Sequence, residues 1–585
     1  MRKALLTGIA LAALATMGAC SPSDGNGNTD LTIVDKQAGD PKWTPFVDDF
    51  IAGWFRLDPG FAVYQGKHEF DGQLPDWTDA GLAKQKAFLH QAIQSAQHFT
   101  PETLSPQQRF ERDYLVQVAK GKLFWLEDAD SPHTNPAYYV GGGLDPNVYI
   151  ARNYADKPTR MKAMIAFFGQ VPTAAAAIRA NLKTPMPRSF IDYGVAGFNG
   201  LGDFYAGDAR QAFADVDDKG LQQQFADASA KAAKAMHDLG AWLASQKASA
   251  NTDFALGSER FSKMLSATEG VDIPLDQLEA IGKADLAKNQ AALKQACAQF
   301  APGATIVACT AKMKANKPPE GPVAAARKQI PELRDFVVSH DIVSIPGTEE
   351  AKVEESPPYN RQNSAYIDPP GPFDKGIPSV YYISPPDPAW PKQVQLDFIP
   401  AKDDLLFTTI HEVMPGHFVQ FLHANRSPSI FGQLFVGYAY AEGWAHYAEQ
   451  MMWDAGYSDG DPEVHIGQLS NALLRDCRFL SAIGLHTKGM TQDQSRQMFV
   501  DECYQDEGTA RQQAARGTYD PAYLNYTLGK LMILRLRDDW TASRGGRKAW
   551  KAFHDQFLSY GGPPIPLVRQ AMMDEPTARA LFPGQ

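Results

Sequence analysis

The chain has 585 residues, of which 44% are hydrophobic and 21% are charged. This composition is ordinary for a globular protein and supplies enough apolar side chains for a large core. The formal net charge is −11 and no long basic run is present. A polyanion such as nucleic acid is therefore a poor partner.

The first residues, MRKALLTGIALAALATMGAC, have the parts of a bacterial export signal. Two basic residues are followed by an apolar stretch, and small residues precede Cys20. The segment MGAC resembles the bacterial lipobox, although Met17 stands where leucine is usual. We expect residues 1–19 to be a signal peptide and Cys20 to be lipidated. A plain cleaved signal and an uncleaved anchor are the alternatives.

Residues 20–42 contain the polar stretch SPSDGNGNTD, which is typical of a flexible lipoprotein tether. Ser21 follows the cysteine, and by resemblance to other lipoproteins a serine there favours the outer membrane, facing the periplasm. From Trp43 onward most segments have helical periodicity. We expect residues 43–585 to form a single large helical domain.

Four further cysteines follow: Cys297, Cys309, Cys477 and Cys503. An even number in an exported chain suggests disulfides. Loop closure favours the pairs that are close in sequence, Cys297 with Cys309 and Cys477 with Cys503. The alternative is four buried free thiols.

One stretch interrupts the helical pattern. Residues 355–388 are rich in Pro, Gly and Tyr, and a helix cannot run through them. Within the stretch, SVYYIS at 379–384 predicts a short strand. A long irregular segment is usually functional or disordered, and its aromatic residues argue against disorder. A structural crossover loop is the alternative.

The segment HEVMPGH (411–417) resembles the metalloprotease motif H-E-x-x-H but departs from its spacing. Histidines four residues apart lie about 40° apart around a helix, so both can face one zinc ion. His411 and His417 are six apart and would diverge by about 120° on an unbroken helix. Proline removes a helical N–H, and glycine permits unusual backbone angles. We therefore expect Pro415 and Gly416 to loop two residues out, so that His417 returns to the face of His411.

A catalytic zinc site needs three protein ligands and one open position. The helix-patterned segment YAYAEGWAHYAEQM (438–451) supplies Glu442, which follows His417 by 25 residues. In one class of zinc peptidases the third ligand is a glutamate on a downstream helix at about this sequence spacing. His446, one turn away, is the rival third ligand. Glu449 shares a helical face with Glu442 and could orient a ligand histidine.

Further blocks accompany these residues. HEVMPGH, AEGWAHYAE, GLHTKGMT (484–491) and AYLNYTLGKLMILRLRDD (522–539) resemble the motifs of a bacterial family, many of them lipoproteins, labelled as a domain of unknown function, number eight-eight-five. The segment FRLDPGFAVYQGKHEFDGQLPDWT (55–78) is similar to that family's opening, so the resemblance covers most of 43–585. The chain departs from the family where Ala482 replaces a frequent aspartate and where GMT replaces GWT.

That family resembles distant zinc peptidases of the thimet oligopeptidase and thermostable carboxypeptidase type. The resemblance implies a mostly α-helical, zincin-like fold with a deep cleft, here with a small β-element next to the metal helix. It also implies one Zn²⁺ per chain, held by His411, His417 and Glu442, and a general base at Glu412.

These features predict an exported zinc peptidase that hydrolyses short peptides and touches the membrane only through its N-terminal lipid. Glu412 would take a proton from the attacking water and pass it to the leaving amine. A donor to the developing oxyanion is normally needed. By position in the family blocks, Tyr526 is the first candidate and His486 the second, although Tyr526 could equally be a core tyrosine.

Two other functions stay open on the sequence. The same site could act as an amidase on peptidoglycan stem peptides. Alternatively, the chain could be a catalytically silent lipoprotein that uses the fold for binding or envelope assembly. The presence of Glu412 argues against the silent lipoprotein, because a pure binder needs no base.

Overall fold

The computed structural model describes residues 39–357, 361, 364–573 and 580–583. The predicted signal peptide, the lipidation site Cys20 and most of the predicted tether lie outside these residues. The described chain is mostly helical, with one small sheet, so the prediction of a mostly helical protein is confirmed. The zincin-like fold and the deep cleft stay predictions.

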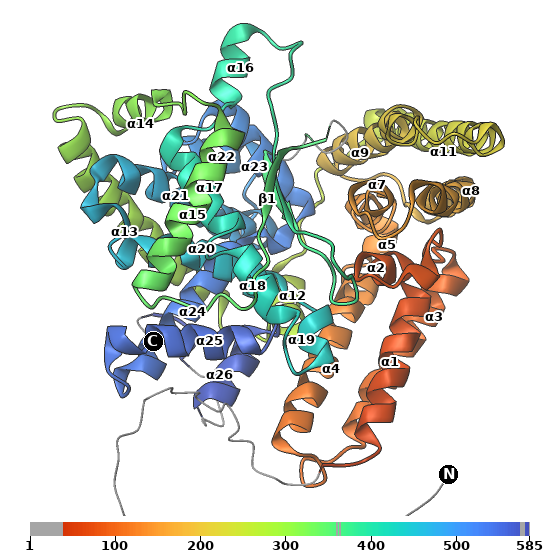
Figure 1. Cartoon of the computed structure of the whole chain (residues 1–585), viewed down its shortest axis with the longest axis horizontal. Coiled ribbons are helices and arrows are strands. Elements are labelled where there is room, and N and C mark those ends of the chain that lie inside the picture. The colour runs from red at the N-terminus through yellow and green to blue at the C-terminus, as the bar shows by residue number, and fades with distance from the viewer. Residues whose placement is uncertain (1–38, 358–360, 362–363, 574–579, 584–585) are drawn as a thin grey trace, which may run out of the picture.

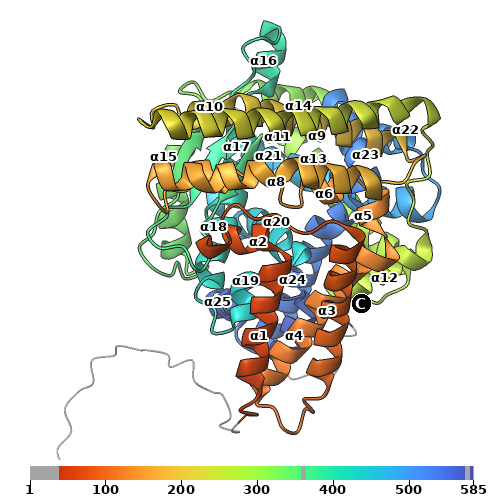
Figure 2. The ribbon, with the colours of Figure 1, turned by 90° about the vertical axis from the view of Figure 1, so that its right-hand side faces the viewer.

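Between Trp43 and Ser245 the named elements of the chain are all helices. Their bounds are α1 (Trp43–Leu57), α2 (Pro59–Tyr64), α3 (Asp79–Gln97), α4 (Pro106–Leu123), α5 (Ser131–Thr134), α6 (Ala137–Val140), α7 (Val148–Ala151), α8 (Lys157–Asn181), α9 (Arg188–Ala206), α10 (Asp208–Ala212) and α11 (Lys219–Ser245). Figure 2 shows α8 and α11 lying side by side above an upright group of α1, α3 and α4. Among the described helices, α8 is long and apolar enough to span a membrane by length and composition. A core helix meets the same criterion, and α8 packs against α11.

The remainder of the chain forms the larger part of the molecule. Its helices are α12 (Ser258–Glu269), α13 (Leu275–Phe300), α14 (Ile306–Ala315), α15 (Pro322–Ser339), α16 (Lys392–Phe398), α17 (Lys402–Glu412), α18 (His417–Ala424), α19 (Ile430–Leu434), α20 (Tyr438–Asp454), α21 (Pro462–Thr487), α22 (Gln492–Asp501), α23 (Glu507–Tyr519), α24 (Asn525–Ala542), α25 (Trp550–Ser559) and α26 (Ile565–Met573). Several of these helices have a capping side chain at their N-terminus. At α22, for example, Thr491 and Gln494 form a capping box. Figure 1 shows most of these helices on the opposite side of the sheet from α1–α11.

The irregular segment between α15 and α16 supplies the sheet. Its strands are β1 (Lys352–Glu355), β2 (Ala365–Asp368) and β3 (Val380–Ile383), in the order β1-β3-β2. β3 is the predicted strand, and it pairs parallel to β1 and antiparallel to β2. β2 is therefore an edge strand, and it lies against α17, the helix that ends at Glu412. The small β-element is next to the predicted metal helix.

Two clusters of buried apolar side chains form the core. One is made almost entirely by α1–α11, and the other by the later helices and the sheet. The short segment after α18 links them, because Phe431 and Phe435 belong to the N-terminal cluster. The ring of Phe435 lies 4.9 Å from that of Trp54 and 5.6 Å from that of Phe61. These contacts fix the N-terminal helices against the part of the chain that carries the predicted site.

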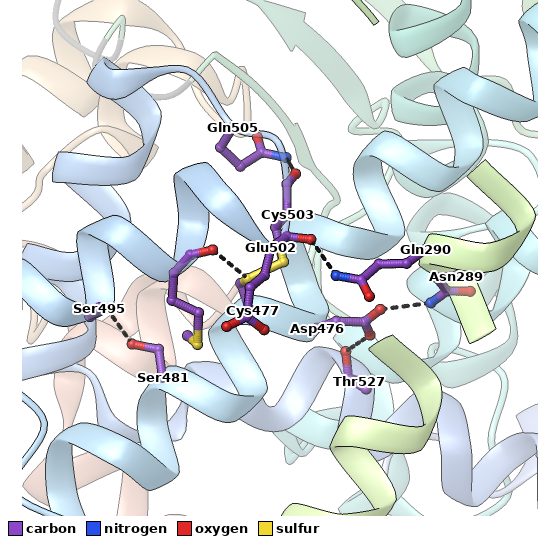
Figure 3. Close-up of a disulfide and its surroundings, with 11 residues drawn as sticks. Asn289, Gln290, Asp476, Cys477, Ser481, Ser495, Glu502, Cys503, Gln505 and Thr527 are labelled. Atoms are coloured by element: carbon purple, nitrogen blue, oxygen red, sulfur yellow. Dashed lines mark hydrogen bonds between the residues drawn. A yellow bond between two sulfur atoms is a disulfide. The ribbon is translucent and has the colours of Figure 1, made fainter. Parts of the chain in front are cut away.

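Both sequence-near cysteine pairs form disulfides in the structure. Cys297 and Cys309 join the end of α13 to α14, and Cys477 joins α21 to Cys503, just after α22. Figure 3 shows the second disulfide beside Asp476, whose carboxyl group accepts a hydrogen bond from Asn289. Helix α21, which passes beside the predicted metal ligands, is thus covalently tied to its neighbour.

A pair of glycines sets the distance between α20 and α24. A Cβ atom at Gly443 would lie 2.5 Å from the Cα of Gly529, and one at Gly529 would lie 1.9 Å from the carbonyl oxygen of Ala439. Both obstacles are backbone atoms, so neither can rotate away. Because Glu442 directly precedes Gly443, this close approach also places a predicted metal ligand.

We expect Gly529→Ala to destabilise the protein by about 1–3 kcal/mol or more, because two packed helices must separate. The measurement is the thermal unfolding midpoint. The matched control is Gly169→Ala in α8, where the added methyl group would meet no atom within 4 Å beyond the adjacent backbone of its own helix. The midpoint of this control should be unchanged or higher. A Gly529→Ala protein that melts at or above the wild-type temperature would contradict the packing argument.

Candidate metal centre

The break between α17 and α18 brings the two histidines together. α17 ends at Glu412, and α18 begins at His417. In the intervening turn the Gly416 N–H donates to the carbonyl oxygen of Ile410, 2.9 Å away. A Cβ atom at Gly416 would lie 1.9 Å from the carbonyl oxygen of His411, so only glycine fits there. The ring centroids of His411 and His417 are 4.9 Å apart, which agrees with the looped-out interpretation of the spacing.

Glu442 on α20 completes a group of three candidate ligands. One donor atom from each of His411, His417 and Glu442 lies within 4.8 Å of the others. Glu442 Oε2 is 3.3 Å from His411 Nε2 and 3.5 Å from His417 Nε2. The two histidines are buried, and the Glu442 side chain is 23% exposed. The group therefore has one side open to solvent.

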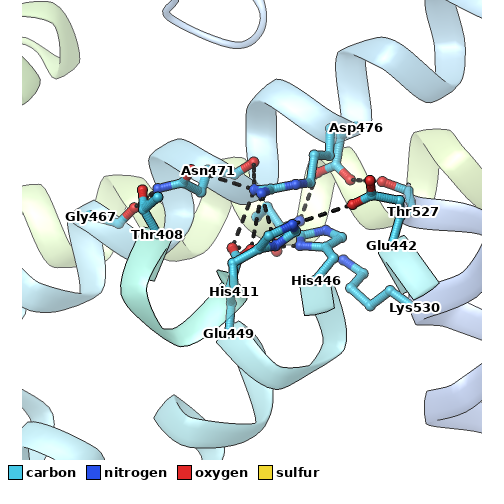
Figure 4. A network of polar contacts seen from close by, with 12 residues as sticks. Thr408, His411, Glu442, His446, Glu449, Gly467, Asn471, Asp476, Thr527 and Lys530 are labelled. Atoms are coloured by element: carbon cyan, nitrogen blue, oxygen red, sulfur yellow. Dashed lines mark hydrogen bonds and ion pairs between the residues drawn. The ribbon is translucent and has the colours of Figure 1, made fainter. Parts of the chain in front are cut away.

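Glu449, one helical turn beyond His446 on α20, orients the first histidine. Its Oε1 accepts a hydrogen bond from His411 Nδ1 at 2.7 Å, and Figure 4 shows His411 joined to both Glu449 and Glu442. Glu449 is fully buried, and Arg475 of α21 lies 3.0 Å from the same oxygen. With Nδ1 donating to Glu449, Nε2 is the ring atom of His411 that faces Glu442.

The second histidine is oriented in the same way. His417 Nδ1 lies 3.2 Å from Oε1 of Gln420, which sits three residues later on α18. The turn itself is tied to α20, because the Trp444 indole N–H donates to the Pro415 carbonyl at 3.0 Å. Trp444 is two residues from Glu442, so one buried hydrogen bond fixes the distance between the histidine turn and the third ligand.

Electrostatics in the group are governed by burial and by mutual contact. Burial and Arg475 act to lower the pKa of His411, but Glu442 and Glu449 raise it to about 9. Burial acts to raise the pKa of Glu442, but His411 and His417 hold it well below its usual range. Glu449 is likewise held ionised: burial opposes the charge, and Arg475 and His411 lower its pKa. Two ionised carboxylates, Glu442 and Glu449, therefore flank the His411 ring.

His446, the rival third ligand, points elsewhere. It is fully buried, its Nδ1 lies 3.6 Å from Glu449 Oε2, and Figure 4 shows Lys530 beside it. Burial and the charge of Lys530 lower the pKa of His446 to about 3, so the ring is neutral. It is not one of the three residues whose donor atoms converge.

The side chain of Glu412 is held by a backbone N–H group of the sheet. Its Oε2 accepts a hydrogen bond from the backbone N–H of Ile367, 3.1 Å away, on the edge strand β2. Glu412 is not one of the converging ligands, although it is adjacent in sequence to His411. The carboxylate is thus fixed by strand β2 and is not a member of the converging group.

The two candidate oxyanion donors occupy different places. The ring of Tyr526, at the start of α24, lies 6.4 Å from the ring of His411. Both ring nitrogens of His486 are engaged by backbone groups: Nε2 donates to the Gly517 carbonyl at 2.7 Å, and Nδ1 accepts from the Leu256 N–H at 3.2 Å. Burial lowers the pKa of His486 to about 4. His486 has no ring nitrogen left for a substrate, so Tyr526 is the remaining candidate.

Comparison with known proteins agrees with the motifs. The family model described as "Bacterial protein of unknown function (DUF885)" matches residues 59–572. The chain belongs to this family. No function comes with this DUF885 assignment, and among curated proteins none matches the chain.

Two solved structures are similar to this DUF885 chain over nearly their whole length. A protein from Shewanella oneidensis, described as a "putative lipoprotein of unknown function", is 26% identical, with a TM-score of 0.75; the match covers 91% of this chain and 99% of that one. A "putative lipoprotein" from Colwellia psychrerythraea is 17% identical, with a TM-score of 0.77; the match covers 91% of this chain and 98% of that one. The second likeness shows a shared fold.

Several site residues of this DUF885 chain were missed on the sequence. The contact of Gln420 with His417 could have been predicted, because a residue three positions later lies on the same face of a helix. The contact of Arg475 with Glu449 could not have been predicted from the sequence, because it depends on how α21 packs against α20. Ile367 could not be assigned either, since only the fold brings β2 to α17.

Proposed function

We propose that the protein is a zinc-dependent peptidase that hydrolyses short peptides. The observation that carries the proposal is the convergence of His411 Nε2, His417 Nε2 and Glu442 Oε2. Two imidazoles and one carboxylate are ligands that zinc takes in catalytic sites, where the fourth position stays open. Zinc fits this donor set better than magnesium or calcium, which prefer oxygen ligands.

The donor atoms fit a metal for a second reason. Glu442 Oε2 is buried and has no hydrogen-bond partner among the described residues, although two ring nitrogens are nearby. Both histidines have Nδ1 turned toward an outer oxygen, of Glu449 or Gln420. Nε2 of each ring and Oε2 of the carboxylate then face one another, an arrangement that a bound cation would stabilise.

The residues of the chain would divide the chemistry among them. Zinc bound at this site supplies Lewis-acid chemistry, which makes water nucleophilic at neutral pH and polarises a carbonyl group. Glu412 would accept the proton of the attacking water on its carboxylate and deliver it to the leaving amine nitrogen. The Tyr526 hydroxyl would donate to the oxygen on which negative charge develops. Glu449 and Gln420 would keep the two rings oriented throughout.

The test is cleavage of a mixed library of short peptides, followed by mass spectrometry. Zinc-loaded protein should release fragments, and protein stripped by a chelator should not until zinc is restored. No cleavage by the zinc-loaded protein of any peptide in the library would count against the proposal. The catalytically silent lipoprotein would then be favoured.

We also propose that the chain is exported and anchored in the bacterial envelope through lipid on Cys20. The likeness to two proteins described as lipoproteins supports this, together with the lipobox-like segment. Cys20→Ser should release the protein to a soluble fraction. Wild-type protein that is already soluble and carries no lipid in its native host would refute the anchor. Placement in the outer membrane, facing the periplasm, rests on Ser21 alone.

A further inference from the structure

Three arginines surround the ring of Tyr526, and two of them are neutralised. Arg475 lies 3.0 Å from Glu449 Oε1. Arg516 of α23 lies 2.9 Å from Asp520 Oδ2. Their guanidinium carbons are 5.6 and 5.9 Å from the centroid of the Tyr526 ring.

The third arginine has no carboxylate partner among the described residues. Arg478, one turn after Arg475 on α21, donates from Nε to the neutral Oε1 of Gln513 at 2.8 Å. Its guanidinium lies 4.7 Å from the centroid of the Tyr526 ring. The residue is only 9% exposed. Burial and the charges of Arg516 and Arg475 lower the pKa of Arg478.

A buried cation without a counter-ion is costly, because the protein does not replace the water that solvated it. Chains normally pair such a group, as this one pairs Arg475 and Arg516. An unpaired arginine next to a candidate active site is therefore suited to an anion that arrives with the substrate. Its two terminal nitrogens have the geometry that grips a carboxylate at both oxygens.

The position of Arg478 limits where that anion can be. The Arg478 guanidinium is 4.7 Å from the Tyr526 ring, and that ring is 6.4 Å from the His411 ring. Each distance is shorter than two residues of extended peptide, at about 3.3 Å per residue. An anion on Arg478 would lie within about three residues of an amide bond placed at the candidate ligands.

We propose that Arg478 binds a carboxylate of the substrate in a subsite beside Tyr526. The inference rests on the proposed peptidase function and adds the substrate class: short peptides with a carboxylate within about three residues of the bond that is cut. That carboxylate is either the C-terminal group or an Asp or Glu side chain. Arg478 is then a specificity-determining residue.

The experiment measures binding apart from cleavage. Zinc-loaded Glu412→Gln protein is equilibrated with three pentapeptide libraries, and the bound peptides are quantified by mass spectrometry. The first library has free C-terminal acids and no acidic side chains, the second is its C-terminal amide, and the third is amidated with one Asp or Glu. We expect the first library to bind about 10–100-fold better than the second, the range for a charge-assisted contact.

Adding Arg478→Gln should abolish that preference, whereas Arg478→Lys should keep part of it. The matched control is Arg188→Gln, an exposed arginine on α9 that pairs with Asp192; its preference should be unchanged. If Arg478→Gln lowers the melting temperature, the test uses Arg478→Lys instead, which should lose part of the preference for carboxylate peptides. If the third library binds more weakly than the first, the carboxylate is the C-terminal group. If it binds more strongly, the carboxylate is a side chain, and equal binding means that the subsite accepts either group.

Equal binding of all three libraries, binding of none of the three, or a preference for carboxylate peptides that survives Arg478→Gln would overturn the inference. A different result would refute the proposed peptidase function. Selective binding of carboxylate peptides by a protein that cleaves none of them would refute the peptidase and leave the carboxylate subsite in place.

Discussion

Glu412→Gln should reduce peptide hydrolysis by about 10²–10⁴-fold, the range assigned to general acid–base catalysis. The change removes the proton acceptor and keeps the shape of the side chain. The amide oxygen of glutamine can still accept the hydrogen bond that Ile367 N–H gives to Glu412. We therefore expect an unchanged melting temperature and unchanged zinc content, so the loss of rate would belong to the chemistry.

The measurement is kcat/KM on a peptide found in the library, together with zinc content and thermal unfolding of the same samples. A Glu412→Gln protein that hydrolyses the peptide at the wild-type rate would show that this carboxylate is not the base. A protein that loses its zinc would show that Glu412 is a ligand.

Glu442→Gln should have its main effect on the metal. It replaces an anionic ligand by a neutral one, whereas both histidines and their partners stay in place. We expect zinc affinity to fall by more than the ~10–100-fold typical of losing an outer hydrogen-bond partner. Competition with a chelator of known affinity measures this directly.

The control for the loss of one negative charge is Glu354→Gln, on the exposed face of strand β1. Its zinc affinity should match the wild type. If Glu442→Gln retains zinc and Glu412→Gln loses it, the roles of the two glutamates are inverted.

The candidate ligands could be predicted from the sequence because the information about them is local. The six-residue gap between His411 and His417 demands a break in the helix, and Pro415 and Gly416 supply one. The site depends on Gly416 in particular, because any side chain there would meet the carbonyl of His411. Glu442 and Glu449 follow from helical periodicity on a single element.

The rest of the site depends on packing between elements far apart in the sequence. Arg475 meets Glu449 only because α21 crosses α20, and Arg478 meets Tyr526 only because α24 packs beside α21. No spacing within one segment encodes such contacts. The four-residue strands β1 and β2 were missed for a related reason, because they are too short to show a period of two. His486 was chosen by its place in a motif, and its role as a core residue held by two backbone groups became visible only in the fold.

Zinc stoichiometry tests the central claim most directly. Protein purified without chelator, incubated with zinc and freed of excess metal should contain close to one zinc ion per chain. His417→Ala, treated in the same way, should contain almost none, because it lacks one of the three side chains that would bind the zinc. Wild-type protein without zinc, or a His417→Ala protein that binds it as fully, would contradict the account.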